Sequence, residues 1–123
     1  MIDLLNVQPH QISTDIRGYK ILMYALPGLG KTSEAVKPEG SLLFAVEKGY
    51  LAIAGVNAVD ITSWADILTA VAQLKKPEVK ARFKHVVIDT IDELVYIAEK
   101  HICQTHQVTQ LNEIPWGHIG SLI

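Results

Sequence analysis

The stretch Ala25-Leu26-Pro27-Gly28-Leu29-Gly30-Lys31-Thr32 decides how this chain of 123 residues folds. An apolar run at residues 19–24 precedes it and predicts a buried strand, and residues 33–36 can continue a helix behind it. A strand, a glycine-rich loop, a Gly-Lys-Thr triplet and a helix in this order form the phosphate-binding loop, or P-loop, pattern. We therefore expect an α/β domain that binds phosphate groups at this turn.

The residue types in the loop suit that chemistry. Gly28 and Gly30 allow positive φ and let backbone N–H groups approach a phosphate chain without an intervening Cβ. Lys31 supplies a positive charge for the β- and γ-phosphates, and the Thr32 hydroxyl is a suitable Mg²⁺ ligand. The sequence departs from the pattern at Ala25, where G-x-x-x-x-G-K-[ST] has glycine, and alanine is the smallest replacement.

Composition restricts the class of protein. Apolar residues make up 49% and charged residues 20% of the chain, which is typical of one globular domain. The net charge of −2 gives no overall attraction to nucleic acid, although a local basic groove stays open. The single cysteine, Cys103, excludes an intrachain disulfide and fits a reducing cytosol. No apolar run is long enough for a membrane span, and the first residues lack a signal-peptide pattern.

Two further apolar runs predict buried parallel strands that end in carboxylates. Residues 41–46 are continuously apolar after Ser41 and lead to Glu47. Residues 86–88 lead to Asp89, and an aspartate at such a position can hold the Mg²⁺ of a P-loop site, usually through a water. Ligands of open α/β sheets bind at this carboxyl edge, so both side chains are candidate site residues.

Two amphipathic helices complete the pattern. Ser63 with Asp66 predicts a capping box for a helix over residues 64–74, which the Lys75-Lys76-Pro77 sequence ends. Asp89 or Thr90 can cap the second helix. Residues 51–62 stay open between strand and loop, and residues 104–112 read as a loop before a final segment opened by Pro115. The predicted buried stripes are Trp64, Ile67, Leu68, Val71 and Leu74 in the first helix, and Ile91, Leu94, Val95, Ala98 and Ile102 in the second.

Two residue clusters have an ordinary and a functional interpretation. The first is basic and could contact a nucleic-acid backbone, but we favour a solvated helix end and loop; it consists of Lys75, Lys76, Lys80, Arg82 and Lys84. The second consists of His101, Cys103 and His106. It lacks the spacing of zinc ligands, so we favour ordinary helix residues.

Several stretches together resemble a known group, the phage-encoded AAA/RecA-like ATP-binding proteins, some of which are recombinases or single-strand annealing proteins. The similar stretches are residues 18–32, 42–49, 62–66, 85–94 and 112–117. The resemblance implies a three-layer RecA-like P-loop NTPase with a parallel sheet and helices on both faces. It also implies binding of ATP and Mg²⁺, a role in phage DNA recombination or replication, single-stranded DNA as a partner, and a homo-oligomer.

The resemblance also assigns residue roles. Many AAA proteins have glutamate directly after the Walker B aspartate, where this chain has Thr90. In RecA-like proteins the glutamate instead ends the strand after the P-loop helix, which makes Glu47 the expected catalytic base, with Asp92 and Glu93 as alternatives. Lys31 acts beside Glu47 in catalysis, and Thr32 and Asp89 hold the metal. The expected nucleotide-binding residues are Pro27, Gly28, Leu29, Gly30, Lys31, Thr32 and Ser33, the last at the α-phosphate.

The expected strand order indicates whether these residues hold a whole domain. In RecA-like sheets, ordered 5-1-4-3-2, a fourth strand separates the P-loop strand from the Walker B strand, and only three core strands are recognisable in this sequence. We therefore expect residues 1–123 to be an N-terminal fragment of a longer P-loop NTPase domain. Two alternatives stay open: a truncated or degenerate module that binds nucleotide or partners without turnover, and a small P-loop kinase. The kinase requires lid arginines, and neither Arg17 nor Arg82 lies in a lid-like loop.

Overall fold

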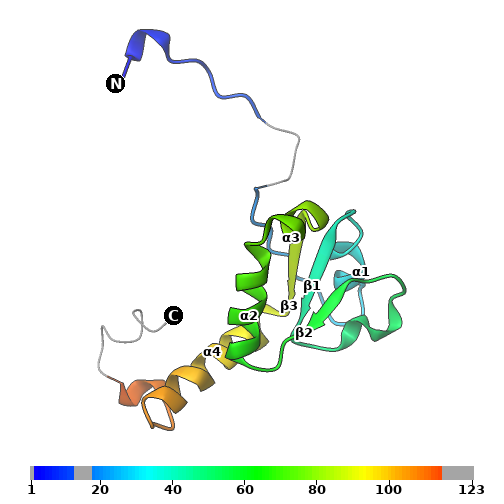
Figure 1. Cartoon of the computed structure of the whole chain (residues 1–123), viewed down its shortest axis with the longest axis vertical. Coiled ribbons are helices and arrows are strands. Elements are labelled where there is room, and N and C mark those ends of the chain that lie inside the picture. The colour runs from blue at the N-terminus through cyan, green and yellow to red at the C-terminus, as the bar shows by residue number, and fades with distance from the viewer. Residues whose placement is uncertain (1, 13–17, 115–123) are drawn as a thin grey trace.

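Three parallel strands form the centre of the protein, as a computed structural model that describes residues 2–12 and 18–114 shows (Figure 1). They are β1 (Ser41–Ala45), β2 (Ala58–Asp60) and β3 (His85–Asp89), in the order β2-β1-β3. The two strands predicted from apolar runs at 41–46 and 86–88 are confirmed, and the open region 51–62 contains β2. Ala45 is in register with both Asp60 and Asp89, so the three strands end on one line.

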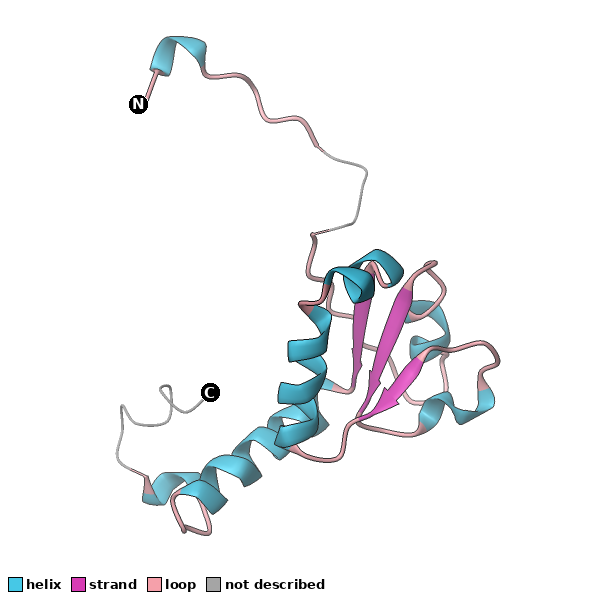
Figure 2. Cartoon of the chain, in the orientation of Figure 1, coloured by secondary structure: helices cyan, strands magenta, loops and turns pink. Residues whose placement is uncertain are grey.

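Among the described residues there are four α-helices and three short 3₁₀ helices, and the first 3₁₀ helix, near the N-terminus, lies well away from the strands (Figure 2). No α-helix in the described ranges is long and apolar enough to cross a membrane. The predicted final segment from Pro115 lies outside the described residues. The α-helices are α1 (Lys31–Ala35), α2 (Trp64–Leu74), α3 (Pro77–Arg82) and α4 (Ile91–Thr105), and the 3₁₀ helices are η1 (Leu4–Asn6), η2 (Gly49–Ala52) and η3 (Leu111–Glu113).

The capping box before α2 is confirmed. The Ser63 hydroxyl accepts a hydrogen bond from the Asp66 N–H at 3.3 Å, and the Asp66 carboxylate accepts from the Ser63 N–H at 3.2 Å. The same carboxylate accepts from the backbone N–H and the hydroxyl of Thr62, both at 2.9 Å. These bonds, the backbone one from Thr62 first, lower the pKa of Asp66. The start of α2 is therefore fixed by local polar contacts.

The helix α3 is an element that the sequence interpretation missed, because Pro77 was taken only as a stop signal. Proline is also favoured in the first turn of a helix, where its missing N–H leaves no bond unmade. Here Pro77 ends α2 and begins α3, and Lys80 and Arg82 lie in the last turn of that new helix. The basic cluster therefore lies on and around a second short helix rather than in a loop.

The core lies between β1 and the helices α2 and α4. Phe44, Ile61 and Ile67 are its buried centre. Leu43 and Ala45, on the opposite face of β1, are also buried, so this strand is covered on both faces as a central parallel strand should be. Figure 1 shows α2 and α4 to one side of the strands and α1 to the other. The half-buried residues packed against the centre are Leu42, Val46, Trp64, Ala70, Leu74, Leu94 and Ile97.

Both predicted helix stripes are partly wrong. Leu94, Ala98 and Ile102 are at least half-buried as expected, but Ile91 and Val95 stay about half exposed. Contact with α2 sets the rotation of α4, since Ile97 packs on the core and His101 stacks on Trp64 with ring centroids 6.1 Å apart. In α2, Leu68 and Val71 are likewise exposed, because the inward face follows Trp64, Ile67, Ala70 and Leu74.

The strand predicted immediately before the P-loop is not formed. Residues 19–24 are assigned no secondary structure, and Leu22 and Tyr24 are 76% and 87% exposed. An apolar run is buried as a strand only when neighbours pair with it, and within the described residues β3 pairs only with β1. The α/β class and the parallel sheet are confirmed, whereas the full RecA-like layering is not reached in this part of the chain.

Candidate functional site

The P-loop turn has the backbone geometry that its glycines predict. Gly28 and Gly30 adopt φ of +81° and +82°, and no heavy atom lies within 4 Å of a Cβ added at either position. The positive φ, rather than crowding, is what calls for glycine here. Pro27 and Leu29 flank Gly28 on the exposed side of the loop, and α1 starts at Lys31 as predicted.

Lys31 folds back over the loop. Its ammonium nitrogen donates a hydrogen bond to the Ala25 carbonyl oxygen at 2.9 Å. The contact uses the backbone of residue 25 and not its side chain, so the replacement of glycine by Ala25 leaves it intact. The positive charge thereby lies over the turn through which a phosphate chain would run.

Thr32 and Asp89 meet although they are 57 positions apart in the sequence. The Thr32 hydroxyl donates to the Asp89 carboxylate, with an Oγ1–Oδ2 distance of 2.5 Å, and the pair is partly buried. The contact joins the first turn of α1 to the end of β3. A hydroxyl and a carboxylate are hard oxygen donors, the kind that Mg²⁺ takes, so these two residues fit that metal.

Glu47 is tied to the same strand end. The N–H groups of Val46 and Glu47 both donate to the Asp89 carbonyl oxygen, at 2.9 and 3.1 Å. The Glu47 carboxylate in turn accepts a long hydrogen bond of 3.4 Å from the Thr90 hydroxyl. Thr90 occupies the N-cap position of α4 but makes no side-chain cap bond there. The backbone segments that carry Glu47 and Asp89 are therefore held next to each other at the carboxyl edge of the sheet.

A third carboxylate, Asp60, ends β2 on the same line and was not singled out from the sequence. It accepts a hydrogen bond from the Tyr50 hydroxyl at 2.6 Å, and this bond raises the pKa of Tyr50. Tyr50 belongs to η2, which begins two residues after Glu47, so the contact ties the loop that carries Glu47 to the end of β2. The sequence signal for Asp60 would have been a carboxylate at the end of an apolar strand. This signal was hard to recognise because β2 is so short.

The remaining candidates lie apart from this cluster. Ser33 lines a separate cavity of about 510 Å³ together with the end of α1 and residues 53–57. Asp92 and Glu93 are exposed in the first turn of α4. Among the described residues, no three histidine, cysteine or acidic side chains are grouped as a metal site, and His101 instead stacks on Trp64.

Comparisons with known proteins agree with this arrangement. A protein family described as an AAA domain matches residues 17–120. The SPbeta prophage-derived uncharacterized protein YorG of Bacillus subtilis (strain 168) is 31% identical over 114 residues, which cover 91% of this chain. The chain spans about a third of that relative's length, since the match covers 35% of it. No solved structure gives a significant match.

The family match extends from just before the P-loop to beyond α4, and so includes the P-loop with Lys31 and the elements that carry Thr32, Glu47 and Asp89. A prophage relative fits the phage origin that the resemblance implies. The AAA domain is a P-loop domain of the ATPase type, and such domains generally bind nucleotide with Mg²⁺. This chain belongs to the AAA domain family.

Proposed function

We propose that this chain is the nucleotide-binding core of a Mg²⁺-dependent, RecA-like ATPase. The observation that carries the proposal is the 2.5 Å contact between Thr32 and Asp89. It brings the P-loop hydroxyl and the strand-end carboxylate together, which are the two oxygen donors that hold Mg²⁺ in P-loop NTPases. When bound, the metal neutralises charge on the β- and γ-phosphates.

The chain's own residues have separate tasks in this proposal. The backbone of residues 27–30 cradles the phosphates, and the Lys31 ammonium leaves the Ala25 carbonyl to neutralise them. Ser33, which lines a separate cavity, has no part in the phosphate contacts of this proposal. Glu47 accepts a proton from the attacking water, because it follows the end of β1 at the same edge of the sheet as Asp89. Backbone bonds to Asp89 hold the loop that carries Glu47 in place, and the Thr90 hydroxyl donates to its carboxylate.

We further propose that the ATPase acts on DNA in phage recombination or replication and works as a homo-oligomer. The prophage relative supports the role in a phage. The action on DNA and the homo-oligomer rest on the resemblance to phage-encoded AAA/RecA-like proteins. Neighbouring subunits of such ATPases supply a cation that neutralises transition-state charge. An oligomer would provide that cation to this site.

The NTPase domain is proposed to include at least one more strand, next to β3. Val86 and Ile88 of β3 are 45% and 40% exposed, and the nearby run 19–24 is exposed as well. A parallel strand between them would pair both backbones, and a complete parallel sheet has both of its faces covered. The same observation favours a second candidate function, a module that binds nucleotide without turning it over.

Calorimetric titration with ATP and Mg²⁺ tests the proposal. We expect binding by the unmodified chain and a loss of at least about a hundredfold in the Lys31→Ala variant, because phosphate contacts to a charged group are strong. The Lys37→Ala variant is the matched control, since it removes the same charge from beyond the end of α1, where Lys37 pairs only locally with Glu34. Equal affinity of the two variants would refute the P-loop assignment, and binding without phosphate release would favour the second candidate.

A further inference from the structure

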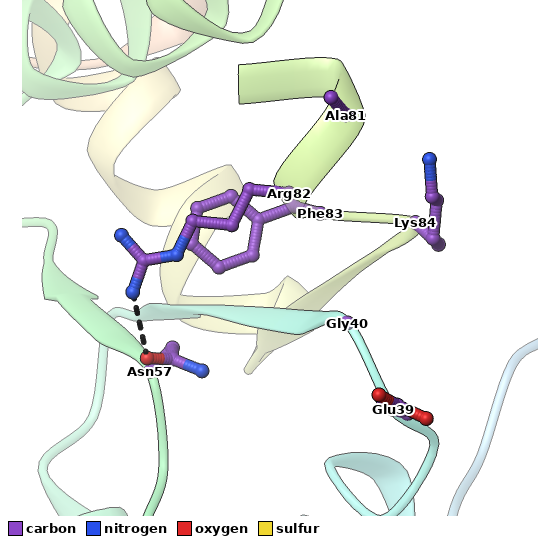
Figure 3. A pocket seen from close by; sticks show the side chains of 7 residues that line it. All are labelled: Glu39, Gly40, Asn57, Ala81, Arg82, Phe83 and Lys84. Carbon is purple, nitrogen blue, oxygen red and sulfur yellow. Dashed lines mark hydrogen bonds between the residues drawn. The ribbon is translucent and has the colours of Figure 1, made fainter. Parts of the chain in front are cut away.

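A cavity of about 490 Å³ lies at the end of the sheet opposite the candidate nucleotide site (Figure 3). Gly40, Asn57 and Lys84, which line it, each stand directly before one of the three strands. The candidate nucleotide site occupies the other ends of the same strands. The cavity is therefore spatially distinct from the P-loop and can bind a different ligand.

One part of the wall of this cavity, residues 81–84, belongs to the most basic part of the chain, and one carboxylate, that of Glu39, also lines the cavity. Residues 75–84 contain five basic residues, the basic cluster Lys75, Lys76, Lys80, Arg82 and Lys84, against one acid, Glu78. The segment has a surplus of four positive charges in a chain whose net charge is −2. Within the described ranges, none of these five cations forms a salt bridge with a carboxylate. Such a local surplus attracts polyanions although the whole chain does not.

The charged and polar side chains at the cavity are two cations, Arg82 and Lys84, the Glu39 carboxylate and the Asn57 amide. The Arg82 guanidinium lies over the Phe83 ring, 4.8 Å from its centroid, and donates to the Asn57 side-chain oxygen at 3.4 Å. Figure 3 shows the Asn57 amide nitrogen turned away from Arg82, where it keeps donors for a ligand. The exposed guanidinium plane can stack on a nucleobase, and Asn57 can bond to the edge of one.

The cations do not converge on one point. In Figure 3 the Lys84 side chain points away from Arg82, and its ammonium donates to the Lys80 carbonyl at 3.2 Å. Lys75 and Lys76 follow the end of the neighbouring helix α2. A single phosphate could contact one or two of these groups, whereas a chain of phosphates could contact most of them in turn. The spread of charge therefore favours a polyanionic strand.

We propose that the basic cluster and the Arg82–Phe83–Asn57 surface bind the phosphodiester backbone of single-stranded nucleic acid, with a base against the guanidinium plane. A single strand is the occupant because an unpaired base exposes its face for stacking on a side chain, whereas the faces of bases in a duplex are covered by their neighbours. The inference rests on the part of the proposed function that concerns DNA. It does not depend on ATP hydrolysis, since the two sites lie at opposite ends of the sheet.

Fluorescence anisotropy with a labelled oligothymidine of about 20 nucleotides tests the inference on the full chain. Arg82→Gln combined with Lys84→Gln is expected to weaken binding about tenfold at about 50 mM salt, and to lower the slope of log K against log salt by about 1.4, from two lost single-strand phosphate contacts. Lys48→Gln combined with Lys100→Gln is the matched control, with the same charge change and both residues outside the cluster.

The outcomes separate this inference from the proposed ATPase. Lys31→Ala is expected to lose ATP and keep the oligonucleotide, and the cluster variant to do the reverse. No binding by the unmodified chain at low salt, or equal weakening in the cluster variant and its control, would overturn the inference and leave ATP binding untouched. Equally tight binding of a duplex of the same length would overturn the single-strand assignment.

Discussion

Two apolar runs of this chain are alike in sequence and differ in structure. Residues 19–24 and residues 41–46 each lead to a charged residue of the candidate site, Lys31 through the P-loop and Glu47 directly. The second run is the central strand β1, with a neighbour on each side. The first has no assigned strand and exposes Leu22 and Tyr24 to solvent. Apolar composition gives a segment the capacity to be a core strand, and available pairing partners decide whether it becomes one.

The largest effect on activity is expected at Glu47, the carboxylate that follows the paired run. Glu47→Gln should leave ATP affinity nearly unchanged and lower turnover by about 10²–10⁴-fold, the usual contribution of a general base. Initial rates of phosphate release, with calorimetric affinity measured beside them, check this. If Glu47→Gln keeps full turnover, the base lies elsewhere, and the exposed acids Asp92 and Glu93 become the next candidates.

The second prediction concerns the stability of the paired run. Phe44 is 3% exposed at the centre of the core, so Phe44→Ala should lower the free energy of unfolding by about 3–5 kcal/mol. Urea unfolding followed by circular dichroism measures it. A loss below about 1 kcal/mol, the size of an average substitution, would mean that β1 is not the packed centre of the domain.

A smaller effect is expected at the contact that orients Glu47. Thr90→Val keeps the shape of the side chain and removes the hydroxyl that donates to Glu47. We expect turnover to fall about tenfold with unchanged ATP affinity, as one hydrogen bond is worth about 1 kcal/mol or slightly more. Thr90→Ser restores the hydroxyl and should restore the rate. A serine variant as slow as the valine variant would assign Thr90 a packing role instead.

The smallest effect is expected in the unpaired run, and it tests the comparison most directly. Leu22→Ala removes an apolar side chain that is 76% exposed, so the free energy of unfolding should change by no more than about 0.5 kcal/mol. The measurement is the same urea titration as for Phe44→Ala. A loss of several kcal/mol would show that residues 19–24 pack against a partner in solution, and the contrast with β1 would disappear.

The sequence predicted the parts of the fold that depend on local chemistry or on an unbroken apolar run. The capping box of Ser63 and Asp66 is a short-range contact, and β1 and β3 are apolar on both faces, so each could be recognised without knowing its neighbours. The meeting of Thr32 with Asp89 also followed, because the first turn after the P-loop and the end of a core strand come together at one edge of such a sheet.

The features that were not predicted depend on contacts between segments that are far apart in the sequence. The rotation of α4 is set by its contact with α2, where His101 stacks on Trp64, and not by the helix's own apolar pattern. Pro77 is both a helix stop and a helix start, and only the structure shows that it serves as both. The hydrogen bond from Thr90 to Glu47 joins two residues that share no motif, so their spacing in the sequence did not predict it.

The carbonyl oxygen of Asp89 has a consequence for how this site can change during evolution. It accepts hydrogen bonds from two successive N–H groups, those of Val46 and Glu47, and it belongs to the backbone. Substitution of the Asp89 side chain would therefore remove the proposed metal ligand without releasing the loop that carries Glu47. If the proposed ATPase activity holds, a lineage of this domain can lose that activity by one mutation and keep its fold. Copies without activity, retained for binding alone, would then be one mutational step from active ones.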